Sequence, residues 1–166
     1  MIRLAHGLDE AGFEDGVWAT TVINSNSPRQ LDVPMARGII DFARAGQLTL
    51  ITPFCLAGAM APITVAGALV LQHAEALAGI TLAQLARAGA PVAYGGFSSN
   101  VDMKSGSPAF GTPEYVNAAL ATAQIARRLR VPVRTSAVNA SVAPLNGTCS
   151  MVVPVITLNN TPDKCT

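Results

Sequence analysis

The stretch that decides the fold is YGGFSSNVDMKSGSPAFGTPEY, residues 94–115. It starts at the end of a short apolar strand predicted over residues 92–95 and continues through a long run of small, polar and glycine-rich residues. It finishes at Thr112, Pro113 and Glu114, which are typical of a helix start because they combine an N-cap residue, a proline in the first turn and an acidic side chain. Loops this long are usually functional or disordered. We therefore expect a functional site in this stretch.

Apolar runs on both sides of this stretch predict a repeating order of strands and helices. Strands are predicted over residues 17–23, 48–52, 92–95 and 131–135. One helix is expected between an Asp32 N-cap and Gly46 as the residue that ends it. A second helix runs to residue 88 after a turn over residues 53–58, with a break near Gly79, and a third follows Thr112. This alternation favours parallel strands joined by right-handed crossovers, and therefore an α/β fold.

The composition limits the classes of protein that the chain can represent. It has 166 residues, enough for one domain, with 13% charged residues and a net charge of +1. Neither nucleic acid nor an anionic membrane surface is therefore expected as a partner. The cysteines form no CxxC pair and the two histidines lie far apart in the sequence, so no metal site is predicted. No secretory signal is recognised at the start, and we expect a cytoplasmic protein.

Residues 45–72 contain no charged side chain and are long enough to span a membrane. The stretch also contains Pro53, Pro62 and several glycines, which interrupt regular structure. A strand, a turn and a buried helix explain these residues better than a span does. We therefore expect no membrane partner.

Each predicted strand leads, at its carboxyl end, into small polar residues. These are Asn24 and Asn26, Thr52, residues 95–100, Ser136 and Asn139. In parallel α/β folds this edge of the sheet binds ligands. Four strand–helix units make half of an eight-stranded barrel, which needs about 250 residues. The pattern alone leaves open both a smaller open sheet and a part of a barrel.

Several motifs follow one another between residues 9 and 139. They are DEAGF (9–13), NSNSP (24–28), TPF (52–54), AGAMAP (57–62), the opening stretch over 94–106 and 110–115, and NAS (139–141). With these motifs the chain resembles the trimethylamine methyltransferase family, the corrinoid-dependent methyltransferases that include glycine betaine methyltransferases. Matches of this length and order are far more specific than a single glycine motif.

The resemblance implies a TIM-barrel fold, here a partial (β/α)8 barrel of about four β-α units with parallel strands. It also implies transfer of a methyl group from a tertiary or quaternary amine, of the trimethylamine or glycine betaine type, to the Co(I) corrinoid of a separate cobalamin-binding protein. The corrinoid is thus expected from the partner, with no cofactor or metal bound by this chain itself. Because the sequence contains no pyrrolysine, it resembles the non-pyrrolysine branch of the family.

The family pattern ends near Pro144, so we expect a partial barrel domain over residues 1–144 and a divergent tail over residues 145–166. Four strands cannot close a barrel, and the open sheet edges should favour self-association. Two other functions stay open. One is a non-catalytic open α/β domain that binds a small molecule or another subunit, and the other is an inactive truncated copy of the enzyme.

Methyl transfer from an ammonium group is mostly a positioning task, and cations bind carboxylates, carbonyl oxygens or aromatic faces. The expected substrate-binding residues are Asn24, Asn26, Thr52, Tyr94, Phe97, Asn100, Asp102 and Asn139, while Lys104 and Glu114 are expected to contact the partner or its corrinoid. Structural roles compete with these assignments: a local turn for Asp102, helix-dipole complementarity for Glu114 and simple solvation for Lys104. The sequence does not indicate a catalytic residue.

Overall fold

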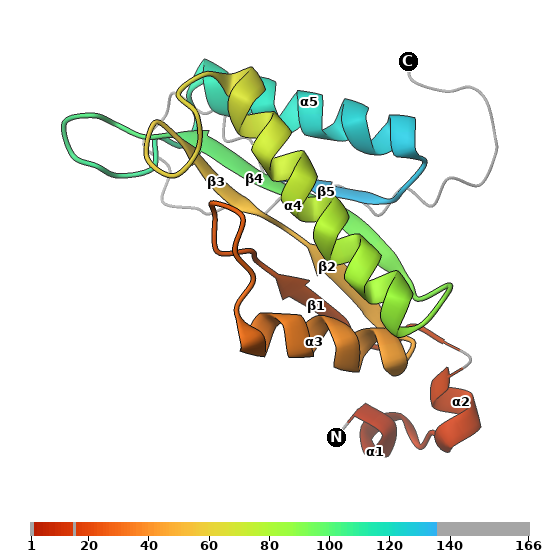
Figure 1. Cartoon of the computed structure of the whole chain (residues 1–166). Coiled ribbons are helices and arrows are strands. Elements are labelled where there is room, and N and C mark those ends of the chain that lie inside the picture. The colour runs from red at the N-terminus through yellow and green to blue at the C-terminus, as the bar shows by residue number, and fades with distance from the viewer. Residues whose placement is uncertain (1, 15, 136–166) are drawn as a thin grey trace.

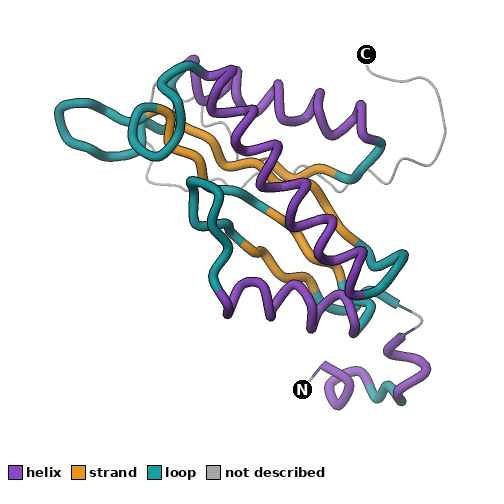
Figure 2. Tube along the Cα trace, viewed as in Figure 1, coloured by secondary structure: helices purple, strands orange, loops and turns teal. Residues whose placement is uncertain are grey.

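The computed structural model describes residues 2–14 and 16–135, in which short strands alternate with helices (Figures 1 and 2). In chain order the elements are α1 (Ile2–His6), α2 (Glu10–Glu14), β1 (Thr20–Ile23), α3 (Val33–Arg44), β2 (Leu48–Ile51), β3 (Phe54–Ala57), α4 (Val65–Ala86), β4 (Val92–Asn100), α5 (Pro113–Leu129) and β5 (Val133–Thr135). The predicted tail over residues 145–166 and the predicted domain boundary before it lie outside the described residues.

The strands form one parallel sheet in the order β1, β2, β4, and both β3 and β5 also pair with β4. β1 pairs with β2. β2 and β3 pair in turn with the first and last parts of β4, and β5 pairs with the middle of β4, residues 94–96. This is the strand order of a β/α barrel. The α/β fold class with parallel strands is therefore confirmed, and the sheet is compatible with a part of such a barrel.

Two predictions about this sheet are wrong. Residues 53–58, predicted as a turn, contain β3, which pairs with β4 directly after Pro53. Proline lacks the N–H that a strand donates, so Pro53 interrupts the strand without ending it. β4 continues to Asn100 instead of ending at Gly95, because its last four residues pair with β3. The loop of the opening stretch thus begins only after Asn100.

The predicted ends of α3 and α5 are confirmed. Asp32 Oδ1 accepts a hydrogen bond from Met35 N at 2.9 Å, and Gly46 follows α3 with a φ of +68°. Thr112 Oγ1 accepts a hydrogen bond from Tyr115 N at 3.4 Å and caps α5. These caps fix where the chain leaves each loop, and Thr112 in particular fixes the start of α5 beside the end of β4.

The break expected near Gly79 does not occur, and α4 runs without interruption from Val65 to Ala86. A Cβ at Gly79 would lie 2.7 Å from Ile51 Cγ2. α4 therefore packs closely on Ile51 of β2 at Gly79, and the small size of the glycine serves this packing instead of a change of direction.

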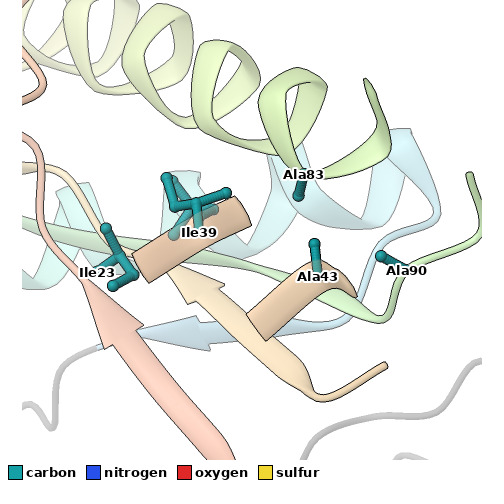
Figure 3. Close-up of a cluster of buried hydrophobic side chains, with 6 residues drawn as sticks. Ile23, Ile39, Ala43, Ala83 and Ala90 are labelled. Atoms are coloured by element: carbon teal, nitrogen blue, oxygen red, sulfur yellow. The ribbon is translucent and has the colours of Figure 1, made fainter. Parts of the chain in front are cut away.

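The helices α3, α4 and α5 cover the same face of the sheet (Figure 1). Their contact with the sheet buries one cluster of Ile23, Ile39, Ala43, Ile51, Ala83 and Ala90, most of which Figure 3 shows. A second cluster consists of Ala76, Tyr94 and Ala126. The alanines bring the helices close to the sheet, which places the loops at the carboxyl ends of the strands next to the helix starts.

By length and composition, α4 is apolar enough to cross a membrane, which for one helix in the described part of the chain is weak evidence. Its sheet-facing side carries Gln72 and Glu75, which are buried and hydrogen-bonded to the sheet and its loops. α4 therefore packs against the sheet along this side, and 28% of its apolar 18-residue stretch is buried. The absence of a membrane partner stays a prediction.

Candidate functional site

The sheet has two faces, and strand alternation assigns side chains to each of them. Ile51 and Tyr94 are register partners and pack against the helices. Successive side chains of a strand point to opposite faces of the sheet. Phe54 and Phe97 follow Ile51 and Tyr94 by three residues, so they lie on the opposite face. In a β/α barrel this opposite face is the barrel interior. We call it the inner face.

Four aromatic side chains gather at the carboxyl edge of β3 and β4. We call Phe54, Phe97, Phe110 and Tyr115 the aromatic edge. The rings of Phe54 and Phe97 stack with centroids 4.9 Å apart. Phe110, from the loop after β4, and Tyr115, from the first turn of α5, meet Phe97 edge-on at 5.4 and 6.4 Å. Phe110 is 55% exposed, so the aromatic edge is open to solvent on one side.

Thr52 lies next to this cluster on the inner face. Its Oγ1 is buried and has no hydrogen-bond partner among residues 2–14 and 16–135. Gly95 lies across from Thr52, and a Cβ at Gly95 would fall 2.1 Å from Thr52 Oγ1. Thr52 and Phe97, two of the predicted substrate-binding residues, are therefore brought to the same face and edge. A buried hydroxyl without a partner needs an explanation, such as a bound water, ion or ligand.

Asn100, a third predicted residue, ties the end of β4 to the start of α5. Its Oδ1 accepts a hydrogen bond from Thr112 Oγ1 at 2.7 Å, and its backbone carbonyl accepts one from Ala109 N at 2.8 Å. Asn100 is half-buried next to the aromatic edge. The geometry gives it a positioning role for the loop that carries Phe110.

Asp102 and Lys104 lie in the exposed part of this loop. Asp102 Oδ1 accepts from Lys104 N at 3.1 Å and Oδ2 accepts from Ser105 Oγ at 2.7 Å. Hydrogen bonds from Ser105 and from the Lys104 backbone lower the pKa of Asp102. This is the local turn that competes with substrate binding for Asp102. Glu114 is exposed in the first turn of α5, where it complements the helix dipole.

Tyr94 is separated from the other predicted residues because it faces the helices. Its side chain is fully buried against Ala76 and Ala126, and its hydroxyl lies 3.2 Å from His73 Nδ1. Burial raises the pKa of the Tyr94 phenol. Its place in the core provides packing, and we do not include it in the candidate site.

Asn24 and Asn26 are exposed in the loop after β1. This loop is held by Glu75 of α4, a residue that sequence reasoning missed. Glu75 Oε2 accepts hydrogen bonds from the Ser25 hydroxyl and, at 2.7 Å, from Ser27 Oγ, while Glu75 Oε1 accepts from Arg29 N at 2.7 Å. The signal in the sequence is that Glu75 is the sole charged residue in the apolar stretch that forms α4.

Cys55 lies on the helix side of β3, beside the same carboxylate. Its Sγ is 3.3 Å from Ser27 Oγ and 4.0 Å from Glu75 Oε2. Burial, together with the charge of Glu75, raises the pKa of the Cys55 thiol to about 11. The thiol is therefore neutral near pH 7 and is not poised to act as a nucleophile.

A hydrogen-bonded group joins β4 to both flanking helices. Ser98 Oγ donates to Gln72 Oε1 at 2.5 Å, and Gln72 Nε2 donates to Thr122 Oγ1 at 3.0 Å. A Cβ at Gly96 would lie 2.5 Å from Thr122 Cγ2. The glycine lets α4 and α5 approach β4, which holds the aromatic edge in place.

The predicted contact at Asn139 lies outside the described residues. Over the ranges that the structure describes, no group of three or more His, Cys, Asp and Glu side chains could hold a metal ion.

Comparison with known proteins identifies the family. A family model described as trimethylamine methyltransferase (MTTB) matches residues 1–146. The chain is 44% identical over 115 residues (69% of the chain) to the glycine betaine methyltransferase of Desulfitobacterium hafniense strain Y51. It is 38% identical over 132 residues (80% of the chain) to trimethylamine methyltransferase MttB1 of Methanosarcina mazei. These matches cover 24% and 27% of the relatives, so the chain spans about a quarter of their length. Since the family match extends over most of its residues, the chain belongs to the trimethylamine methyltransferase family.

Proposed function

We propose that this chain forms part of the amine-binding mouth of a methyltransferase. The enzyme would move a methyl group from a tertiary or quaternary amine, of the trimethylamine or glycine betaine type, to the Co(I) corrinoid of a cobalamin-binding partner protein. Family membership supports the reaction class, and the names of the relatives support the class of amine.

The observation that carries this proposal is the aromatic edge at the carboxyl ends of β3 and β4. Aromatic faces attract alkylated ammonium groups through the ring quadrupole, at about 0.5–2 kcal/mol for each contact. Phe54 and Phe97 lie on the inner face, where a barrel enzyme binds its substrate, and Phe110 extends the surface outward. The Thr52 hydroxyl, which is buried and has no partner in the described part of the chain, lies on the same inner face.

In this arrangement the chain orients the ammonium group, because a methyl transfer needs the transferred carbon in line with its acceptor. The Co(I) corrinoid, when the partner brings it, supplies the nucleophile that takes the methyl group. The loop after β4 is the candidate edge for the partner, since Met103 is 77% exposed there and Lys104 lies beside it. Both residues project beyond the strand that carries Phe97.

A chimeric enzyme tests the proposed function. In the glycine betaine methyltransferase of D. hafniense, the stretch of 115 residues that matches this chain would be replaced by the corresponding residues of this chain. Methyl transfer from glycine betaine and from trimethylamine to the partner corrinoid protein is then followed by the change in corrinoid absorbance. We expect transfer from at least one of the two amines.

Two controls complete this test. The 166-residue chain by itself should transfer no methyl group, because it spans about a quarter of the relatives' length. Circular dichroism and thermal melting should show that the chimera folds like its parent. A folded chimera that transfers methyl groups from neither amine would contradict the proposal.

A further inference from the structure

A cavity lies on the helix side of the sheet, between α3, α4 and the loop after β1. Its volume is about 180 Å³, well above the roughly 10–15 Å³ that a single water molecule requires. Ile23, Ile39 and Ile51 provide apolar walls, and the first two are visible in Figure 3. Glu75 lines the cavity from α4. The cavity therefore combines an apolar body with a carboxylate in its wall.

The charge of Glu75 is oriented but not neutralised by its neighbours. The side chain is 7% exposed, and its hydrogen-bond donors are the hydroxyls of Ser25 and Ser27, the backbone N–H of Arg29 and, at 4.0 Å, the Cys55 thiol. No lysine or arginine forms an ion pair with it in the described ranges, where an ion pair does join Arg37 and Asp41. Neutral donors stabilise a carboxylate without removing its field, so the cavity wall stays negative.

We propose that this cavity is a second binding site, for a small alkylammonium cation. The charged nitrogen would lie at the Glu75 carboxylate and the alkyl groups would contact the isoleucine walls. A neutral ligand would leave the carboxylate without an opposite charge, and an anion would be repelled by it. The site is apart from the aromatic edge, and it does not rest on the proposed methyl transfer.

Arg29 distinguishes a cation from a zwitterion as the ligand. Arg29 lines the cavity and is exposed to solvent. The guanidinium would weakly repel a cation, whereas it would attract the carboxylate of a zwitterion. Removing its charge therefore has opposite effects on the two kinds of ligand.

Choline and its neutral carbon isostere, 3,3-dimethyl-1-butanol, are the probes. Each is titrated into the 166-residue chain with ¹³C-labelled isoleucine methyl groups, whose signals are followed by NMR. Choline should shift the signals of Ile23, Ile39 and Ile51, which line the cavity, and leave the exposed Ile63 unchanged. The neutral isostere should bind at least about tenfold more weakly, a difference of about 1.4 kcal/mol.

Four variants locate the cation. Glu75→Gln keeps the size of the side chain and should weaken choline binding at least about tenfold. Ala78→Phe adds bulk to the cavity wall, keeps the carboxylate and should abolish the isoleucine shifts. Arg29→Asn, which tolerates the φ of +55° at this position, should strengthen binding. Phe97→Ala alters the aromatic edge and should leave binding at the cavity unchanged.

Equal affinities for choline and the neutral isostere would overturn the proposal, as would unchanged choline binding in either Glu75→Gln or Ala78→Phe. Weaker choline binding in Arg29→Asn would also overturn it, because removing a positive charge beside the site should favour a bound cation. If choline shifts the NMR signals of the cavity isoleucines but the chimera is inactive, this site is supported and the methyl-transfer proposal is contradicted. The two failures are therefore distinguishable.

Discussion

Two adjacent glycines, Gly95 and Gly96, let β4 fit between crowded neighbours on both faces of the sheet. A Cβ at Gly95 would meet Thr52 Oγ1 at 2.1 Å and the carbonyl oxygen of Ile51 at 2.7 Å. A Cβ at Gly96 would meet Thr122 and Gln72 on the helix side. Neither position needs an unusual φ, so the close approach of other groups is what requires glycine here.

Gly95→Ala should lower the free energy of unfolding by about 1–3 kcal/mol, because the backbone carbonyl of Ile51 cannot move aside without shifting β2. Urea unfolding followed by circular dichroism measures this loss. Gly38→Ala is the matched control, since its Cβ would meet only the flexible Ile23 Cδ1 at 3.2 Å. A loss in Gly95→Ala no larger than in Gly38→Ala would contradict this account of β4.

Glu75 shows the limit of residue-level prediction from the sequence. A lone carboxylate in an apolar helix is a recognisable signal, yet the sequence does not indicate which groups it contacts. Its donors lie 46 to 50 positions away, in the loop after β1. Such contacts depend on how α4 lies across the sheet, which local patterns do not determine.

At the scale of elements, the caps could be predicted and the strand lengths could not. Asp32 and Thr112 begin their helices as expected because capping is a local interaction. The length of β4 depends on β3, and β3 was hidden in a segment with two features of a turn, Pro53 and Gly58. Residues 97–100 form a strand because β3 lies beside them, which the small and polar side chains of Ser98, Ser99 and Asn100 do not indicate.

The turn in the loop after β4 depends on the ionised carboxylate of Asp102. Hydrogen bonds lower the pKa of Asp102 in the folded protein. These bonds therefore stabilise the loop fully above the ordinary pKa of 3.8, and the stabilisation is lost as the pH falls through the lower pKa of the folded state. The Lys104 amide, which donates to Asp102, should therefore titrate with a midpoint below 3.8 in an NMR pH series. Asp102→Asn keeps a neutral acceptor and should abolish this titration. A midpoint at or above 3.8 would contradict the observed turn.

At the scale of the whole molecule, the predicted site separates into several parts. Thr52 and Phe97 come together on the inner face, and Asn100 lies at the same edge of the sheet beside the start of α5, because the carboxyl ends of adjacent parallel strands meet there. Tyr94 goes to the opposite face, since it is an odd number of residues from Phe97 along β4. Strand alternation alone would have separated these two residues, had the extent of β4 been known.

We propose that the aromatic edge holds the ammonium group of the amine. The chimeric enzyme tests it most directly, through the KM for glycine betaine of Phe97→Tyr and Phe97→Leu. Leucine keeps an apolar side chain in the cluster but removes the aromatic face, while tyrosine keeps that face.

We predict that Phe97→Leu raises KM about tenfold, which corresponds to a cation–π contact of about 1.4 kcal/mol, and that Phe97→Tyr keeps KM close to that of the unchanged chimera. Thermal melting of each variant shows whether the fold is retained. An unchanged KM in a folded Phe97→Leu chimera would mean that Phe97 serves packing alone, and would contradict the claim.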